Sequence, residues 1–153
     1  MIFIPYNTPS LKNSKVKTSK GIFCSKTVKK YLGLLGILSY SSSKKIVIGY
    51  KTKPNKFESL IPEFKELFKD KKFPVLISFH FVRESKRKFD FGNATEVIFD
   101  LMTAHGIIPD DNVEFVFPSV MSINGILPTE NNMNNYEWYS VDKENPGVYI
   151  DIH

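Results

Sequence analysis

Runs of apolar residues that are rich in β-branched and aromatic side chains predict most of the strands in this chain. The clearest run is FPVLISFHFVR over residues 73–83, which is expected to be a central strand of a sheet. Further strands are expected over residues 1–6, 21–25, 45–51, 112–122, 136–141 and 146–153. Residues 8–20 are polar, basic and without periodicity, so they are predicted to form a mobile loop.

Apolar residues at helical spacing predict three helices, over residues 25–38, 57–72 and 93–106. In the last of these, Asn93 is expected to be the N-cap, with Glu96 completing a capping-box-like pair. The helices interrupt the strands irregularly, and the chain has no internal repeats. The pattern therefore predicts one α+β domain over residues 1–153, built on a mixed β-sheet packed by helices.

Composition excludes several classes of protein. With 42% hydrophobic residues, the chain has enough apolar material for a core, which excludes a wholly disordered chain. No apolar run approaches the ~20 residues that span a bilayer, and the first residues do not have the pattern of a secretory signal. We therefore expect a soluble, cytoplasmic protein. Cys24 is the single cysteine, which excludes an intrachain disulfide and a cysteine-rich zinc site.

The charges are strongly segregated along the chain. Twelve lysines precede the first acidic residue, Glu58, whereas the rest of the chain has nine basic and sixteen acidic residues. Residues 1–57 therefore carry a formal charge of +12 and the remainder −7. Such a basic part suits a polyanionic partner. The alternative is a solvated lysine-rich surface that aids solubility, but aromatic residues and glycines interleaved with lysines over residues 17–31 favour binding.

Three aspartates suggest a site for a divalent metal ion. Asp90 follows the strand 73–83, and Asp110 and Asp111 precede the strand 112–122, so neighbouring strands are expected to bring them to one edge of the sheet. Clustered carboxylates are tolerated chiefly around a cation, and an all-oxygen site suits Mg²⁺ or Mn²⁺. The alternative is that Asp110 and Asp111 form a solvated turn and that Glu96 only caps its helix. Four basic residues near Asp90 would hold a phosphodiester backbone: Arg83, Lys86, Arg87 and Lys88.

The order of these features is similar to that of a known family. A first strand leads to a proline-containing turn, a Lys-Asn element at Lys12 and Asn13, and then a short basic strand and a helix. Later comes KRKFDFGNATEVIFDLMTAHGIIPDDNVEF, which supplies Asp90, Asn93, Asp100, Gly106, Asp110 and Asp111. In both parts the chain resembles the RusA family of Holliday-junction resolvases.

The resemblance implies a RusA-like homodimer that nicks four-way DNA junctions in a Mg²⁺-dependent reaction, with Mn²⁺ as a substitute. Because family members are common in phages and prophages, the compartment would then be a host cytoplasm. The metal and catalytic residues would be Asp90, Asp110, Asp111 and Glu96. The DNA contacts would come from Lys12, Asn13, Lys15, Lys17, Lys20, Arg83, Lys86, Arg87, Lys88 and Asn93.

The chain departs from the family pattern at two positions. Gly92 stands where the family has a second Asp, and Glu96 stands where it has a Lys. One hypothesis is a rearranged site in which Glu96 replaces the missing ligand and cleavage is retained. A second is a protein of the same fold that binds DNA junctions but has lost cleavage. A third is an interaction protein whose basic part binds an acidic protein surface.

Overall fold

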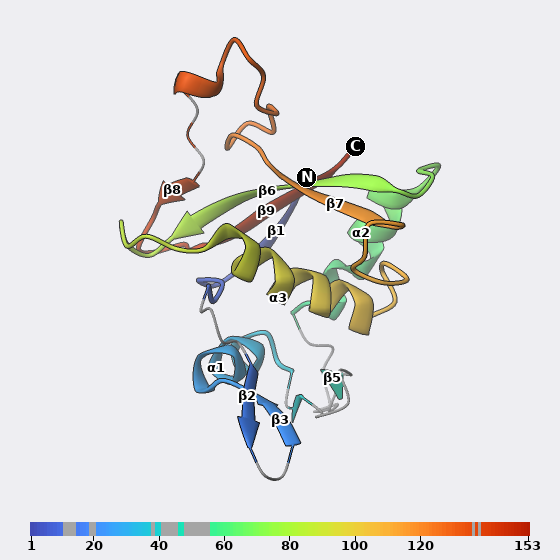
Figure 1. The fold of residues 1–153 in the computed structure, drawn as a ribbon, viewed down its shortest axis with the longest axis vertical. Coiled ribbons are helices and arrows are strands. Elements are labelled where there is room, and N and C mark those ends of the chain that lie inside the picture. Colours follow the sequence, from blue (N-terminus) through green and yellow to red (C-terminus); the bar gives the residue numbers. More distant parts are fainter. Residues whose placement is uncertain are drawn as a thin grey trace.

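Strand β6 (Val75–Arg83) lies at the centre of a mixed sheet in the computed structural model of the chain (Figure 1). It pairs antiparallel with β9 (Gly147–Ile152) and parallel with both β7 (Val116–Val120) and β8 (Tyr139–Val141). Strand β1 (Ile2–Pro5) pairs antiparallel with β9 and completes the order β1-β9-β6-β7. The structure describes residues 1–10, 15–18, 21–37, 39–40, 46–47, 56–135, 137 and 139–153. The predicted α+β class, mixed sheet and central strand are confirmed.

Helix α3 (Phe91–Ala104) covers one face of this sheet (Figure 1). Alternate residues of β6 face it, and Phe79 makes an edge contact with Phe99 at 5.5 Å between ring centroids. Buried α3 residues such as Ile98 and Leu101 complete this layer. Each such side chain contributes roughly 1.5–3 kcal/mol when it is fully buried, so the apolar stripe of α3 fixes the helix on the sheet.

The opposite face of β6 carries polar residues, of which His80 is fully buried. Its Nδ1 lies 2.9 Å from the carbonyl oxygen of Met121, and its Nε2 lies 3.0 Å from Oγ of Ser140. Because a carbonyl only accepts, Nδ1 donates, and Nε2 can then accept from the hydroxyl. Burial lowers the pKa of His80, despite the opposing effects of the Met121 carbonyl and the charge of Glu137. The ring is therefore a neutral bridge between β6 and the segments beside it.

The N-terminal part consists of small elements, of which helix α1 packs on the same core. Strands β2 (Lys15–Thr18) and β3 (Gly21–Cys24) form an antiparallel hairpin, followed by α1 (Lys26–Leu34). Strands β4 (Ser39–Tyr40) and β5 (Ile46–Val47) also pair antiparallel. Tyr31 and Leu32 of α1 belong to the same cluster of buried side chains as the sheet. The hairpin extends away from the sheet beyond α1 (Figure 1).

Several predicted boundaries change. Ser25 caps α1 as expected, with its Oγ accepting from the N–H of Val28, but the helix ends before Gly36, whose φ of 86° stops it. The predicted helix 57–72 is a 3₁₀ turn, η1 (Glu58–Leu60), followed by α2 (Ile61–Phe68). A second 3₁₀ turn is η2 (Met133–Asn135). Among the described helices, none has both the length and the apolar content needed to cross a bilayer.

Two strand predictions are corrected. Residues 15–18 are not loop but strand β2, because pairing with β3 overrides their polar composition. The strand predicted over 112–122 begins only at Val116, since the carbonyl oxygen of Asn112 accepts from the N–H groups of Phe115 and Val116 in a turn. Lys12, Asn13, Lys20 and most of the predicted strand 45–51 lie outside the described residues.

Candidate nucleic-acid interface

A basic turn follows the end of β6. Lys86, Arg87 and Lys88 are all exposed there. Arg83, the last residue of the strand, is half-buried and makes two contacts inside the fold. Its guanidinium lies 4.7 Å from the ring centroid of Phe89, and its Nη1 donates a hydrogen bond to the carbonyl oxygen of Thr8. Arg83 therefore positions the turn, while Lys86, Arg87 and Lys88 present their charges to solvent.

Residues 6–8, which follow β1, are held at this same end of the sheet. Thr8 is fully buried, and its carbonyl oxygen is fixed by Arg83. The ammonium group of Lys56 donates to the hydroxyl of Tyr6 and lies 4.5 Å from the centroid of that ring. Arg83 and Lys56 therefore fix the residues that come just before the lysine-rich part of the chain.

Helix α1 presents exposed lysines beyond this anchor. Lys26, Lys29 and Lys30 are exposed, whereas Val28 and Tyr31 face the core. Lys15 and Lys17 lie in strand β2. The described residues thus include two exposed basic segments, α1 and the turn at 86–88, that are about sixty positions apart in the sequence.

Asp90 has a local structural role at the start of α3. Its Oδ1 accepts a hydrogen bond from the main-chain N–H of Asn93 at 3.0 Å, which makes Asp90 the N-cap. The prediction that Asn93 caps the helix is therefore wrong, and α3 begins two residues earlier. Asp is a preferred N-cap because its carboxylate satisfies an otherwise unpaired helix N–H. The Nδ2 atom of Asn93 is buried without a hydrogen-bond acceptor.

Asp110 and Asp111 lie at the other end of the sheet from Asp90. Since β6 and β7 are parallel, α3 returns the chain to the start of β6, and Val116 pairs with Val75 (Figure 1). The length of the 14-residue helix, roughly 20 Å, separates the two carboxylate positions within one chain. The expectation that they meet at one edge of the sheet is therefore wrong.

Local hydrogen bonds explain the Asp110-Asp111 pair as a turn. Asp110 Oδ1 accepts from the N–H of Asp111 at 3.0 Å, and its Oδ2 accepts from Nδ2 of Asn112 at 2.8 Å. Both aspartates are exposed. This geometry is that of a solvated aspartate turn.

Glu96 and Gly92 leave Asp90 without a neighbouring carboxylate on α3. Glu96 is six residues beyond the N-cap, which corresponds to roughly 9 Å along the helix and roughly 120° around its axis. A Cβ at Gly92 would lie only 3.4 Å from Asp90 Oδ1, so a carboxylate at that position would have stood beside Asp90. Among the described residues, no group of three or more His, Cys, Asp or Glu side chains is arranged to hold a metal ion. The expected metal ligands do not fit one ion within a single subunit.

Aromatic residues around Asp90 are a feature that the sequence reasoning missed. Phe89 and Phe91 flank it and, together with Lys88, Val120 and Tyr139, line a hollow of about 350 Å³. The sequence KFDFG could have indicated this hollow, because it places one phenylalanine on each side of Asp90. Two large aromatic side chains beside a basic turn are unusual in a loop that is purely solvated.

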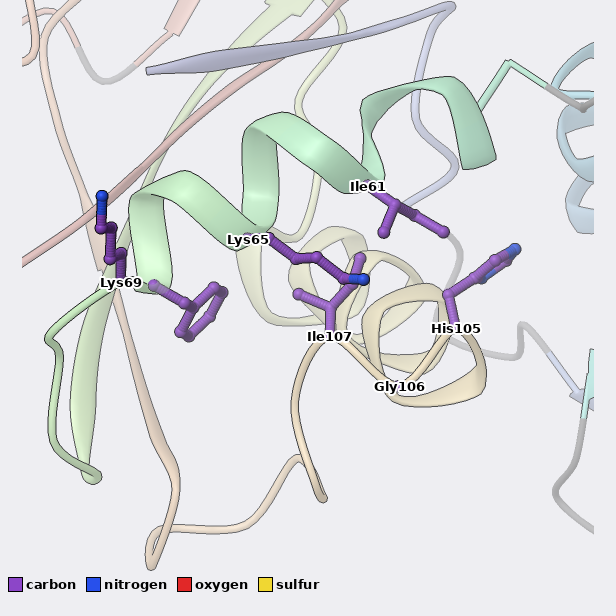
Figure 2. A pocket seen from close by; sticks show the side chains of 7 residues that line it. Ile61, Lys65, Lys69, His105, Gly106 and Ile107 are labelled. Atoms are coloured by element: carbon purple, nitrogen blue, oxygen red, sulfur yellow. The ribbon is translucent and has the colours of Figure 1, made fainter.

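A second hollow of about 240 Å³ lies between α2 and the end of α3 (Figure 2). Its lining is mainly apolar, with Lys65 lying across it beside Ile107 and Lys69 directed away (Figure 2). His105 donates from Nδ1 to the carbonyl oxygen of Leu101 and packs against Phe57. This hollow is at the opposite end of α3 from the basic turn, so it is separate from the candidate interface.

Comparisons of the chain with protein-family models, curated proteins and solved structures find no match.

Proposed function

We propose that this protein binds branched DNA through its lysine-rich N-terminal part and the basic turn at residues 86–88. The contact between Arg83 and Thr8 is the observation that carries the proposal, because it fixes the start of the lysine-rich part beside the turn. We expect a DNA backbone that contacts the turn to continue towards the lysine-rich part, because Thr8 lies just before its first lysine, Lys12. The resemblance to the RusA resolvases favours four-way junctions as the substrate.

Phosphate contacts would supply most of the affinity. Lysines and arginine neutralise phosphates and release condensed counterions, so affinity must fall steeply as salt rises. The hairpin β2–β3 and helix α1 are elements of a size that the DNA major groove admits. Contacts of this kind position a protein on DNA, and the shape of the branch would be recognised by the arrangement of the two basic segments.

The proposal is tested by fluorescence anisotropy on a labelled four-way junction and on a duplex of the same sequence. Affinity should fall by a factor of ten or more between about 50 mM and about 200 mM salt. The double variant Lys26→Gln/Lys30→Gln should bind more weakly and lower the salt slope by about 2. Lys71→Gln/Lys72→Gln is the matched control, because it removes the same charge from exposed residues that precede the start of β6.

Two results would contradict the DNA interface. One is binding that does not depend on salt, which would instead favour an acidic protein surface as the partner. The other is an equal loss of affinity in both double variants, because the effect would then come from net charge and not from α1.

A Mg²⁺-dependent junction nuclease is the second candidate function, and it requires a second subunit. The observation that favours it is that exposed carboxylates stand at both ends of α3, at Asp90 and at Asp111. In a two-fold dimer, if residue i of one subunit meets residue j of the partner, the reciprocal contact also forms. A homodimer can therefore place Asp90 of each subunit beside Asp110 and Asp111 of the other, which gives two equivalent sites.

Complementation between two variants tests this second candidate. Asp90→Asn and Asp111→Asn chains are prepared alone and as a co-expressed mixed dimer, and each is incubated with a junction in Mg²⁺ or Mn²⁺. A site shared between subunits predicts that neither variant nicks alone, whereas the mixed dimer keeps one intact site and nicks. If the unaltered protein binds the junction but never nicks it, cleavage is excluded and junction binding is retained. If it nicks but the mixed dimer does not, the shared site is wrong.

A further inference from the structure

The hollow beside the basic turn has aromatic walls and a cationic rim. Phe89, Phe91 and Tyr139 are half-buried and supply its rings, and Val120 adds an aliphatic surface. Lys88 also lines it, and Lys86 and Arg87 precede Lys88 in the same exposed turn. An apolar ligand would explain the rings but not the cluster of cations at the rim.

The rings of Phe89, Phe91 and Tyr139 are held in place by contacts with one another and with the core. The centroid of Phe89 lies 5.4 Å from that of Tyr139 in an edge contact with an interplanar angle of 82°. Phe81, which is fully buried, makes edge contacts with Phe89 at 5.4 Å and with Phe91 at 5.8 Å. Because edge-to-face arrangements are favourable for aromatic pairs, these contacts fix the rings before any ligand arrives. A ligand that stacks on them therefore meets a surface that is already ordered.

We propose that this hollow receives one unpaired nucleobase of the bound DNA. The inference rests on the proposed function and adds the part of the substrate that the hollow would recognise. A flat aromatic base stacks on aromatic side chains, and its own backbone phosphate would lie near the ammonium group of Lys88. The exposed carboxylate of Asp90 repels phosphate, so the backbone is expected on the side of Lys86, Arg87 and Lys88.

Branched DNA suits such a hollow better than an intact duplex does. A paired base must be unstacked and unpaired before it can enter, whereas a base at a branch or a bulge has already lost part of that stabilisation. Among the lining residues, the polar side-chain groups are the Lys88 ammonium and the Tyr139 hydroxyl. Stacking would therefore dominate, and any of the four bases would be accepted.

The test uses a duplex with one unpaired thymidine and the same duplex with an abasic nucleotide at that position. Both probes have the same backbone charge and the same bulge, so they differ only in the base. The unaltered protein should bind the thymidine probe roughly 5- to 150-fold more tightly, which is the range that one base–aromatic stack contributes. This comparison requires no variant and so does not depend on whether a variant folds.

Variants then locate the effect. Phe91→Leu and Tyr139→Leu keep apolar volume but remove a stacking surface, and each should reduce the preference for the thymidine probe to within about twofold. Phe117→Leu is the matched control, because Phe117 is a 44% exposed aromatic residue of β7 on the other face of the sheet, and it should keep the full preference. Circular dichroism checks that each variant is folded.

The outcomes separate this inference from the proposed function. Salt-dependent binding of both probes with equal affinity would overturn the base-binding hollow and leave DNA binding intact. The same holds if Phe117→Leu and Tyr139→Leu reduce the preference equally. Failure to bind either probe, a four-way junction or a duplex would overturn the proposed function and the hollow together.

Discussion

Arg83 donates a hydrogen bond to the main-chain carbonyl oxygen of Thr8 while its guanidinium lies 4.7 Å from the ring centroid of Phe89. One side chain thus connects the segment that leads into the lysine-rich part with the residue that begins the aromatic hollow. Its position at the end of the central strand makes it a positioning residue for both proposed contacts with DNA.

Replacing Arg83 should affect stability more than it affects phosphate binding. Arg83→Met removes the hydrogen bond and the cation over Phe89 while keeping much of the aliphatic chain, and the buried acceptor loses its donor. We expect a loss of about 1–3 kcal/mol in the free energy of unfolding, measured by urea denaturation.

Arg87→Met is the matched control for this change. Arg87 is exposed, so its replacement should alter stability by no more than about 0.5 kcal/mol. It should, however, lower the salt slope of DNA binding by about 1. If Arg87→Met destabilised the protein as much as Arg83→Met does, the assigned roles of the two arginines would be wrong.

The capping role of Asp90 can be separated from any role in cleavage. Asp90→Ala should lower the free energy of unfolding by about 1 kcal/mol, because the N–H of Asn93 loses its acceptor. Asp90→Asn should cost much less, because Asn is an equally good N-cap. Thermal denaturation of the two variants measures the difference, and equal destabilisation would argue against the cap.

Two glycines are expected to respond to Ala in opposite directions. A Cβ at Gly147 in β9 would overlap with the ring of Phe3 and the carbonyl oxygen of Ile4 in the neighbouring strand. Gly147→Ala should therefore cost about 1–3 kcal/mol. A Cβ at Gly33 in α1 would meet nothing within 4 Å, so Gly33→Ala should stabilise the protein by about 0.5–1 kcal/mol. Urea denaturation of both variants checks the signs, and a stabilising Gly147→Ala would contradict the pairing of β1 with β9.

The buried His80 predicts a dependence of stability on pH. Because its pKa in the folded protein is below the unfolded value of 6.5, the unfolded chain takes up a proton first as pH falls. The stabilising contribution of the neutral ring is complete above that pH and is lost progressively below it. His80→Gln should therefore lose less thermal stability than the unaltered protein between about pH 7.5 and about pH 5.5. A difference of the opposite sign would show that the ring is not held neutral in the fold.

The sequence was sufficient to predict those elements that depend on neighbouring residues alone. The run of β-branched and aromatic residues predicted β6 and its central place, and Ser25 marked the start of α1 because capping depends on three neighbouring residues. The polar strand β2 could not be predicted in the same way. Its pairing with β3 is a contact between segments, and the alternation in KVKT is too short to be distinctive.

The predicted carboxylate site depended on the direction of β7 relative to β6, which the hydrophobic pattern of the sequence does not reveal. Asp90 and Asp111 are correctly placed relative to the helix between them, but whether that helix brings them together depends on the direction of β7. A single helix between neighbouring strands usually returns the chain to its starting end and makes the strands parallel. The capping role of Asp90 was missed because a helix start was assigned to Asn93, three residues later.

Pro118 stands in the middle of β7, the terminal strand of the described sheet, where it pairs with Ile77. A proline has no N–H, and such residues are tolerated in a terminal strand because the missing donor faces outward. The outer side of β7 consequently offers an interrupted row of donors to any strand from another molecule. A second copy of the chain would find little there with which to extend the sheet, so a homodimer that continues the sheet would have to use the other terminal strand, β1.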